Sequence, residues 1–237
     1  MIKKMKYLVK KNKLLSHVVK YIYYRTISKD SNYKKNRRFL KNATEIMHRI
    51  DSIFNELGID YWLEYGTLLG VIRENGFIKH DYDIDLGLFL DDYSEDIEKI
   101  FNKYGFKKAH KFSIDNGIYG LEEAYHFNGV AVDLFYFIKK GNQMYSHGFK
   151  NEDGKSWNQT VEDNGGLIVR EIYFPYSGFR KVKFLGREYP VPYDSDSHLK
   201  AFYGERYMES NSAWNPYTMA KNVITLKNKL GDYIVYE

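Results

Sequence analysis

The clearest pattern of hydrophobic and polar residues in the chain lies between Tyr61 and Phe89. It predicts a strand, a tight glycine turn, a short helix, a loop and a second strand. The second strand alternates apolar residues with aspartates, which is the period of a half-buried strand. Its apolar members are Tyr82, Ile84, Leu86 and Leu88, and its acidic members are Asp81, Asp83 and Asp85. The alternation places Asp83 and Asp85 on one face, with Asp81 at the strand entrance.

The rest of the chain supplies the elements around this stretch. Apolar residues recur at helical spacing between Phe39 and Leu57, and Gly58 is a natural stop for that helix. The pattern of residues 130–138 predicts a strand with apolar residues on one face and Asp133 on the other. A lone carboxylate in so apolar a strand needs a partner or a metal ion. The other predicted elements are a helix capped by Ser94 and ending at Gly105, strands at 106–113 and 117–127, a hairpin turn at Gly141-Asn142, a polar loop over the site at 146–165, strands at 167–174 and 181–191, a helix at 196–203, and a closing helix from Met219 to Leu230.

Neighbouring carboxylates on a rigid strand predict a divalent metal site. They repel one another and raise each other's pKa unless a cation neutralises them. Hard oxygen ligands favour Mg²⁺ or Mn²⁺. An EF-hand calcium loop also begins with D-x-D-x-D, but Leu86 and Asp92 stand where that loop needs glycine and glutamate. A solvated acidic turn fits poorly with the apolar residues between the aspartates.

The turn before the aspartate strand has the composition of a phosphate-binding site. Gly66 and Thr67 begin a helix, whose free N–H groups attract phosphate oxygens. Arg73 lies about two turns further on and can form charge-assisted bonds to the same phosphate, and Glu64 points toward the same turn. No Gly-Lys-Ser/Thr follows, so the turn is not a P-loop. Further candidates for contact with a phosphate or an anionic glycan are Arg170, Arg180, Lys181 and Arg187, although charges on strand faces are more commonly solvated, and His147 is a weak acceptor-site candidate.

Composition and charge narrow the class of protein. The 237 residues, 43% hydrophobic and 28% charged, suffice for one substantial folded domain. The absence of cysteine excludes disulfides and Cys-ligated zinc, and fits a reducing cytoplasm. The net charge of +5 conceals a split, because residues 1–41 hold fourteen Lys and Arg against the single acid Asp30. The remaining 22 of 36 basic and 30 of 31 acidic residues give the body a charge of −8. A nucleic-acid-binding domain would spread its basic surface over the fold, so we expect no nucleic-acid partner.

Residues 1–35 predict a basic amphipathic helix. Its apolar residues at near-helical spacing are Ile2, Met5, Leu8, Val9, Leu15, Val18, Val19 and Ile22, with lysines among them. No uncharged run approaches the length of a membrane span, and no signal-peptide core is present. Two interpretations stay open: a helix lying on an anionic membrane surface, or a helix packed on the domain with a solvated lysine face.

The stretch GTLLGVIRENGFIKHDYDIDLGL at residues 66–88 resembles the signature of the LicD/fukutin-related phosphotransferases. A weaker match is VPYDSDSHLKAFYGERYM at residues 191–208, which resembles the family's proline-containing segment and Leu-x-x-x-Tyr-Gly helix. Family members often show Pro-Trp-Asp-Asp-Asp where this chain has Lys-His-Asp-Tyr-Asp at 79–83, a departure that bears on loop shape more than on the carboxylates. The resemblance implies a nucleotidyltransferase-like α/β (α+β) domain over residues 36–237, with a mixed β-sheet flanked by helices, preceded by the basic helix at 1–35.

The same resemblance assigns roles to particular residues. The implied ligands of one or two Mg²⁺ or Mn²⁺ ions are Asp83, Asp85 and Asp133, the last matching the family's third carboxylate. The residue implied to take the acceptor's proton is Asp133 or Asp81. The residues implied to position phosphates are Gly66, Thr67, Arg73 and Glu64.

The activity implied by the resemblance is transfer of a phosphate-linked alcohol, such as phosphocholine or ribitol phosphate, from a CDP-activated donor to a hydroxyl of a glycan, with release of CMP. The implied partners are the CDP-alcohol and a glycan of capsule, lipopolysaccharide or teichoic-acid type. The expected location is the cytoplasm, with peripheral contact to the inner face of the membrane through the basic helix. Two alternatives stay open: transfer of a nucleoside monophosphate with release of pyrophosphate, or a non-catalytic, membrane-associated adaptor that binds divalent ions and shows no turnover.

Overall fold

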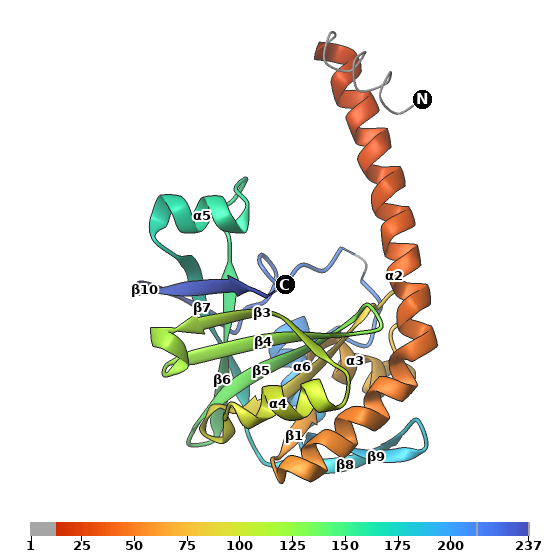
Figure 1. Cartoon of the computed structure of the whole chain (residues 1–237), viewed down its shortest axis with the longest axis vertical. Coiled ribbons are helices and arrows are strands. Elements are labelled where there is room, and N and C mark those ends of the chain that lie inside the picture. Colours follow the sequence, from red (N-terminus) through yellow and green to blue (C-terminus); the bar gives the residue numbers. More distant parts are fainter. Residues whose placement is uncertain (1–12, 212, 237) are drawn as a thin grey trace.

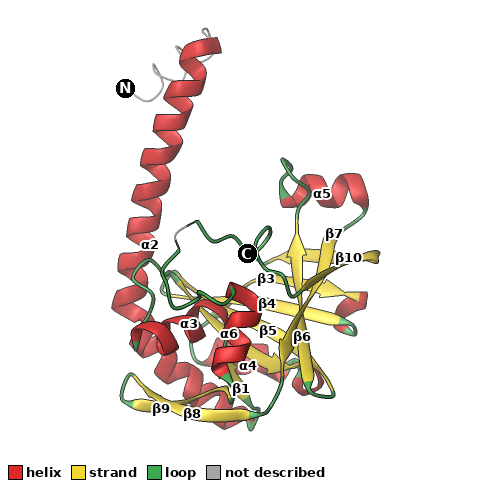
Figure 2. Ribbon diagram, turned by 180° about the vertical axis from the view of Figure 1, so that it is seen from behind, coloured by secondary structure: helices red, strands yellow, loops and turns green. Residues whose placement is uncertain are grey.

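The computed structural model describes residues 13–211 and 213–236, with side chains from Tyr33 onward. Five α-helices, an eight-stranded mixed sheet and a separate two-stranded hairpin make up this part of the chain (Figures 1 and 2). The predicted α/β class with a mixed sheet is therefore confirmed.

The longest element is helix α2 (Lys13–Leu57), which packs on the body through its second half. Its buried residues follow the predicted helical spacing: Phe39, Ala43, Ile46, Met47, Ile50, Ile53 and Phe54. Gly58, with φ +67°, ends the helix and donates its N–H to Phe54 O at 2.9 Å. The helix predicted over Phe39–Leu57 is confirmed, and it begins further upstream than the pattern indicated. Residues 1–12 and the side chains before Tyr33 lie outside the described part, so the amphipathic face predicted for residues 1–35, and the domain boundary at 35, stay predictions.

The sheet is built from strands that are mostly antiparallel. They are β1 (Tyr61–Leu63), β2 (Asp83–Phe89), β3 (Lys107–Ile114), β4 (Gly120–Phe127), β5 (Val130–Lys140), β6 (Gln143–Lys150), β7 (Leu167–Pro175) and β10 (Val223–Val235), in the spatial order β1-β2-β5-β4-β3-β10-β7-β6. The pair β2–β5 is parallel. The hairpin of β8 (Phe179–Phe184) and β9 (Arg187–Pro192) lies apart from this sheet. The shorter helices are α3 (Tyr65–Glu74), α4 (Asp96–Lys103), α5 (Trp157–Asn164) and α6 (Ser195–Tyr203).

Strand β5 has different neighbours along its length. Its first part, Val130–Phe135, pairs with β4, and its last part, Phe137–Lys140, pairs with β6. The sheet therefore curls until its β6 edge returns to β5, and β4 and β6 diverge from the same strand (Figure 2). This divergence opens the space in which the site lies.

Two element predictions are wrong. Residues 146–165 do not form a loop, because β6 continues to Lys150 and a helix, α5, follows with a Ser156–Gln159 capping box. The segment Met219–Leu230 does not close the fold as a helix, because Val223–Val235 is strand β10, paired with β3 and β7. Its β-branched start favours a strand, and pairing with a strand on each side stabilises the extended conformation.

Smaller differences occur at the ends of elements. Ser94 does not cap α4 with its side chain; the N-cap is Glu95, which makes no side-chain capping bond. Asp81 lies just before β2 rather than within it. The other predicted strands, the turn at 141–142 and the helix at 196–203 are present within a few residues of the predicted bounds. No helix in the described ranges combines the length and the apolar character needed to cross a membrane.

Candidate active site

The first turn of α3 holds strand β2 through two hydrogen bonds between backbone N–H groups and side-chain oxygens. The Gly66 N–H donates to Asp85 Oδ2 at 2.9 Å, and the Asp85 N–H donates to the Thr67 hydroxyl at 2.9 Å. A Cβ on Gly66 would lie 3.1 Å from an oxygen of Asp81 and 3.1 Å from one of Asp85. A side chain at this position would therefore crowd the two carboxylates, which would have to shift by a few tenths of an ångström.

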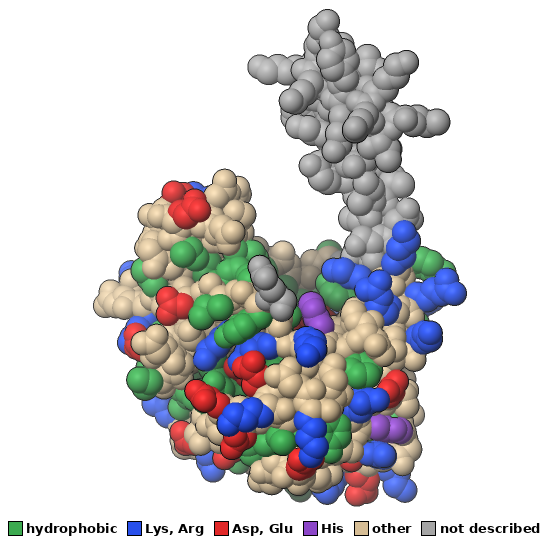
Figure 3. All heavy atoms as spheres, in the orientation of Figure 1, with side chains coloured by type: hydrophobic (Ala, Val, Ile, Leu, Met, Phe, Trp, Pro, Cys, Tyr) green, Lys and Arg blue, Asp and Glu red, His purple; other side chains and the backbone are tan. Residues whose placement is uncertain are grey.

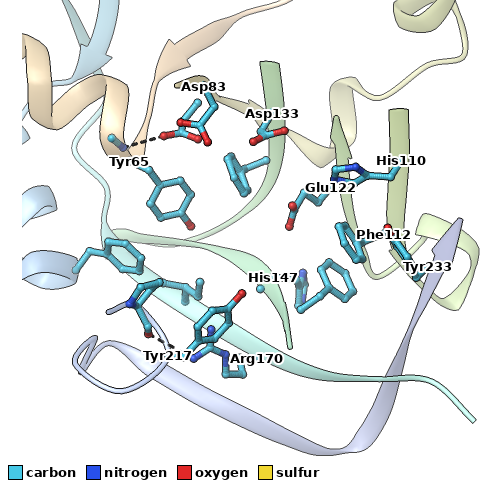
Figure 4. A pocket seen from close by; sticks show the side chains of 18 of the residues that line it. Tyr65, Asp83, His110, Phe112, Glu122, Asp133, His147, Arg170, Tyr217 and Tyr233 are labelled. Carbon is cyan, nitrogen blue, oxygen red and sulfur yellow. Dashed lines mark hydrogen bonds between the residues drawn. The ribbon is translucent and has the colours of Figure 1, made fainter. Parts of the chain in front are cut away.

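Three of the predicted carboxylates meet on adjacent strands. The parallel register of β2 and β5 places Asp85 directly beside Asp133. Asp83 lies two residues earlier in β2 and therefore on the same face. All three line a cleft of about 590 Å³, and Figure 4 shows Asp83 and Asp133 at one end of it.

Asp81 is not among the residues that line the cleft. Its Oδ1 accepts the N–H of Tyr82 at 3.1 Å. Its Oδ2 is buried and has no hydrogen-bond partner within the described residues. Such an oxygen is available to a bound cation or a proton.

The carboxylates raise each other's pKa. Burial raises the pKa of Asp85 well above its usual range, and the charges of Asp83, Asp81 and Asp133 raise it further. Burial, and then Asp83, raise the pKa of Asp133 to about 8. The same two causes raise the pKa of Asp81 to about 8. A divalent cation would relieve this repulsion and displace the protons.

The donor set fits a metal that shares its ligands with substrate. Within the described residues, no group of three or more Asp, Glu or His side chains is ready to hold an ion by itself. Mg²⁺ is usually bound by one or two carboxylates and completes its shell with water and substrate phosphates. Asp83, Asp85 and Asp133 supply oxygens of the required kind on one face, so the chemistry of the site fits Mg²⁺ or Mn²⁺.

The remainder of the cleft is aromatic with a few titratable groups. Its aromatic residues are Tyr65, Tyr82, Phe112, Phe135, Phe149, Trp157, Phe202, Tyr203, Trp214, Tyr217 and Tyr233. Phe112 stacks between Tyr233 and Phe149, with ring centroids 4.7 and 5.1 Å away. The titratable groups besides the aspartates and tyrosines are Glu122, His110, His147 and Arg170. Burial raises the pKa of Glu122 well above its usual range, and Asp133 raises it further.

Three residues predicted to position phosphates are occupied elsewhere. Arg73 donates to Glu74 Oε1 at 2.7 Å and to Tyr207 O at 3.3 Å, and it does not line the cleft. The Thr67 hydroxyl is taken by the Asp85 N–H. Glu64 is 1% exposed, and it caps the start of α3 while bonding two buried side chains. Of the four, the structure leaves Gly66 at the cleft wall.

Three residues at the cleft were missed or misplaced by sequence reasoning. In strand β4, Ala124 pairs with Asp133, and Glu122 lies two residues earlier on the same face. The only sign of Glu122 in the sequence was a carboxylate within a predicted strand. His147 lies in strand β6, not in a loop. Arg170 is buried rather than solvated, and a charge inside the apolar run LIVREIYF was the signal for it.

Comparison with known families bears on the same stretch. The LicD/FKTN/FKRP nucleotidyltransferase domain matches residues 58–194, a span that contains the glycine turn, the four aspartates and strand β7. The chain belongs to this family. The resemblance read from the 66–88 stretch is thereby confirmed.

Individual relatives of this LicD-family chain are distant. It is 26% identical to ribitol-5-phosphate transferase FKTN of Homo sapiens over 191 residues, which is 78% of this chain and 37% of that protein. It is 40% identical to ribitol 5-phosphate transferase FKRP of Homo sapiens over 53 residues, which is 22% of this chain and 11% of that protein. An uncharacterized protein of Rickettsia prowazekii is 29% identical over 137 residues, 55% of this chain and 46% of that protein. The chain thus spans well under half the length of the FKTN protein.

Proposed function

We propose that this chain is a metal-dependent transferase that moves a phosphate-linked alcohol from a CDP-activated donor to a hydroxyl of a glycan, releasing CMP. The main support is the meeting of Asp83, Asp85 and Asp133 at one end of an open cleft. The names of FKTN and FKRP favour ribitol phosphate or a similar cargo. An acceptor of capsule, lipopolysaccharide or teichoic-acid type is part of the same proposal and rests on the family resemblance.

In this proposal Asp83, Asp85 and Asp133 hold Mg²⁺ or Mn²⁺. A bound ion would supply positive charge that offsets the negative charge of the diphosphate and of the leaving CMP, whose P–O bond to the transferred phosphate breaks. The acceptor oxygen forms the new P–O bond and loses its proton. Glu122 lines the cleft, is not among the proposed metal ligands, and has a pKa raised by burial, so it can hold that proton. Asp133 is the base implied by the family resemblance, but a bound cation would lower its raised pKa, so it is the weaker candidate whenever it ligates the metal. Asp81 does not line the cleft and is likewise a weaker candidate for this role.

The test is metal-dependent release of CMP from a panel of CDP-alcohols. We expect Asp83→Asn and Asp85→Asn each to lower the rate at least about tenfold, because metal charge stabilisation contributes several kcal/mol. Asp91→Asn is the matched control, since Asp91 is exposed and lies after β2, outside the cleft. If both cleft variants keep more than about a tenth of the wild-type activity, Asp83 and Asp85 are not the ligands of a catalytic metal ion.

A second candidate is nucleotidyl transfer, which the name of the matching domain favours. The same carboxylates would then act on a nucleoside triphosphate, and pyrophosphate would leave in place of CMP. Assaying both products separates the two reactions. If no donor in either class is turned over, the adaptor interpretation takes their place.

We also propose that the protein contacts an anionic membrane surface from the cytoplasmic side. Exposed cations gather on the described part of α2, at Lys34, Lys35, Arg37, Arg38 and Lys41. Figure 3 shows such basic side chains where the helix leaves the body. Cations near anionic lipid each contribute about 1 kcal/mol, so a cluster of them acts cooperatively.

A further inference from the structure

Arg170 is a buried cation in the wall of the cleft. It lies in β7 beside Gly148 of β6, and 7% of the residue is exposed. Its guanidinium carbon lies 4.8 Å from the centre of the Tyr217 ring, and Nη1 donates to Pro216 O at a long 3.5 Å. Figure 4 shows Arg170 and Tyr217 at the side of the cleft away from Asp83.

Within the described residues, this guanidinium has no acidic partner. No carboxylate oxygen of that part of the chain lies within 4.0 Å of it, and its buried Nε makes no hydrogen bond there. Burial lowers the pKa of Arg170, which is the direction expected for a cation without a counter-ion. The charged form is nevertheless the one present at neutral pH.

Two other shielded cations of the molecule are paired. Lys108, with 6% of its side chain exposed, lies 2.8 Å from Glu98 and also contacts Glu123. Arg73, with 10% of its side chain exposed, lies 2.7 Å from Glu74. A buried charge without such a partner destabilises a fold. Arg170 is therefore better explained by an anion that comes from outside the chain.

The surroundings of Arg170 leave room for that anion. Arg170 and Gly148 both line the open cleft of about 590 Å³, and this cleft supplies the room, because the space over Gly148 is filled by Ile172, 3.0 Å from the position of a Cβ. The planar guanidinium fork of Arg170 matches the oxygens of a phosphate.

We propose that Arg170 is the anion-binding residue of the cleft and that it takes a phosphate group of a substrate, on the side away from the aspartates. The inference rests on the proposed function for the identity of that substrate. The phosphate belongs either to the nucleotide of the donor or to the acceptor. The donor's diphosphate would then be held from both sides, whereas an acceptor phosphate would be held apart from the aspartates.

The test is calorimetric titration with inorganic phosphate, in EDTA so that the carboxylates hold no metal. We expect saturable binding by the wild type, and binding weaker by at least about tenfold in Arg170→Gln. Arg170→Lys should lie between them, because it keeps the charge and loses the fork. Arg180→Gln is the control and should bind as the wild type does, since Arg180 is exposed and outside the cleft.

Thermal unfolding of the ligand-free variants separates binding from packing. Because Arg170→Gln removes an unpaired buried charge, its melting temperature should equal or exceed that of the wild type. Absence of saturable phosphate binding by the wild type would overturn the proposal, and so would equal affinity in Arg170→Gln. The proposal would also be overturned if Arg170→Gln had a lowered melting temperature and Arg170→Lys bound phosphate as tightly as the wild type. Arg170 would then be a packing residue.

Titration with CMP distinguishes the two sources. If the donor's phosphate occupies Arg170, CMP competes with inorganic phosphate and binds more weakly to Arg170→Gln. If the acceptor's phosphate occupies Arg170, CMP and inorganic phosphate bind to the protein at the same time. Arg170→Gln then changes the affinity for inorganic phosphate and leaves the affinity for CMP unchanged. None of these measurements needs turnover. Intact phosphate binding without CMP release from any CDP-alcohol would therefore refute the proposed function and leave this inference standing.

Discussion

At the scale of single residues, the site is defined by how closely Gly66 approaches the aspartates. Its N–H is bonded to Asp85, and the position of its missing side chain lies 3.1 Å from oxygens of both Asp81 and Asp85. A methyl group there would press on the two carboxylates without disturbing the hydrophobic core. The residue thus offers a way to change the proposed metal site alone.

We predict that Gly66→Ala lowers CMP release at least about tenfold, by displacing the carboxylates from their metal geometry. Its melting temperature should change little, because alanine is favoured over glycine in a helix by about 0.5–1 kcal/mol, which offsets the local strain. Gly76→Ala is the control, since a Cβ there meets Glu74 O at an ordinary 3.7 Å. Equal activity in the two variants would show that the Gly66 contact does not matter to the chemistry.

His147 gives the protein a predictable dependence of stability on pH. The groups around it are Glu171, with an oxygen 3.9 Å away, and the rings of Tyr119 and Tyr145. Burial lowers the pKa of His147 from 6.5 to about 4, and Glu171 opposes the change. Below pH 6.5 the unfolded chain therefore takes up a proton that the folded protein does not accept until about pH 4.

The contribution of His147 to the free energy of unfolding should accordingly fall, by about 3 kcal/mol at most, as pH is lowered from 6.5 to 4. Protonation of Asp81 and Asp133 acts in the opposite direction, in the wild type and in the histidine variants alike. Urea unfolding at pH 7 and at pH 4.5 measures the difference. His147→Asn should reduce it, whereas His126→Asn, at an exposed position of β4, should leave it as in the wild type. A pH dependence unchanged by His147→Asn would show that the ring is protonated in the folded protein.

At the scale of elements, α6 is fastened to the glycine turn through one buried carboxylate. Glu64 Oε1 lies 2.7 Å from His198 Nε2 in α6, and Glu64 Oε2 accepts from Trp62 Nε1 at 2.6 Å. His198 in turn stacks on Phe174 of β7, with ring centroids 4.2 Å apart. The sequence suggested a phosphate-positioning role for Glu64, but its contacts join α3, α6 and the sheet.

We therefore predict that Glu64→Ala acts on stability first. It leaves two buried donors unpaired, which costs about 2–5 kcal/mol and lowers the melting temperature by roughly 5–15 °C. Glu45→Ala serves as the comparison, because it removes a glutamate from an exposed ion pair with Arg49 and should cost under about 1 kcal/mol. If Glu64→Ala melts like the wild type but loses donor affinity, the phosphate-positioning role is restored.

The elements also show what a sequence can and cannot predict here. The helical face at 39–57 and the aspartate alternation at 81–88 are local patterns, so they predicted real elements. Strand β10 was misread because its identity depends on β3 and β7, which lie far away in the sequence. The sequence offered Arg170 only as one of four basic candidates for an anion and did not offer Glu122, because their places at the cleft follow from the curling of the sheet, which no local pattern encodes.

At the scale of the whole molecule, charge and packing divide helix α2 into two parts. From Phe39 onward one face belongs to the core, and the Asn36 side chain bonds Lys79 O and Asp81 O. Residues 1–25 carry eight of the fourteen basic residues of the head and precede all these contacts. The described contacts of α2 with the body, from the cation–π contact of Lys35 with Tyr82 onward, come after this segment.

We predict that a protein lacking residues 1–25 stays folded and still releases CMP, but loses most of its co-sedimentation with anionic vesicles. The full-length protein should bind such vesicles in low salt and detach as the ionic strength approaches about 0.15 M and above. Neutral vesicles are the control. Full-length protein that ignores anionic vesicles, or a truncation that unfolds, would favour the interpretation in which the head packs on the domain.

Strand β5 has a consequence for how errors in folding are tolerated. A slip of one residue along it would turn Asp133 to the opposite face and away from Asp85. The same slip would break the pairing of β5 with β2, β4 and β6 at once, because all three strands are hydrogen-bonded to β5 in a fixed register. A misaligned site would thus be a misfolded protein, and the quality control that removes unfolded chains would remove it as well.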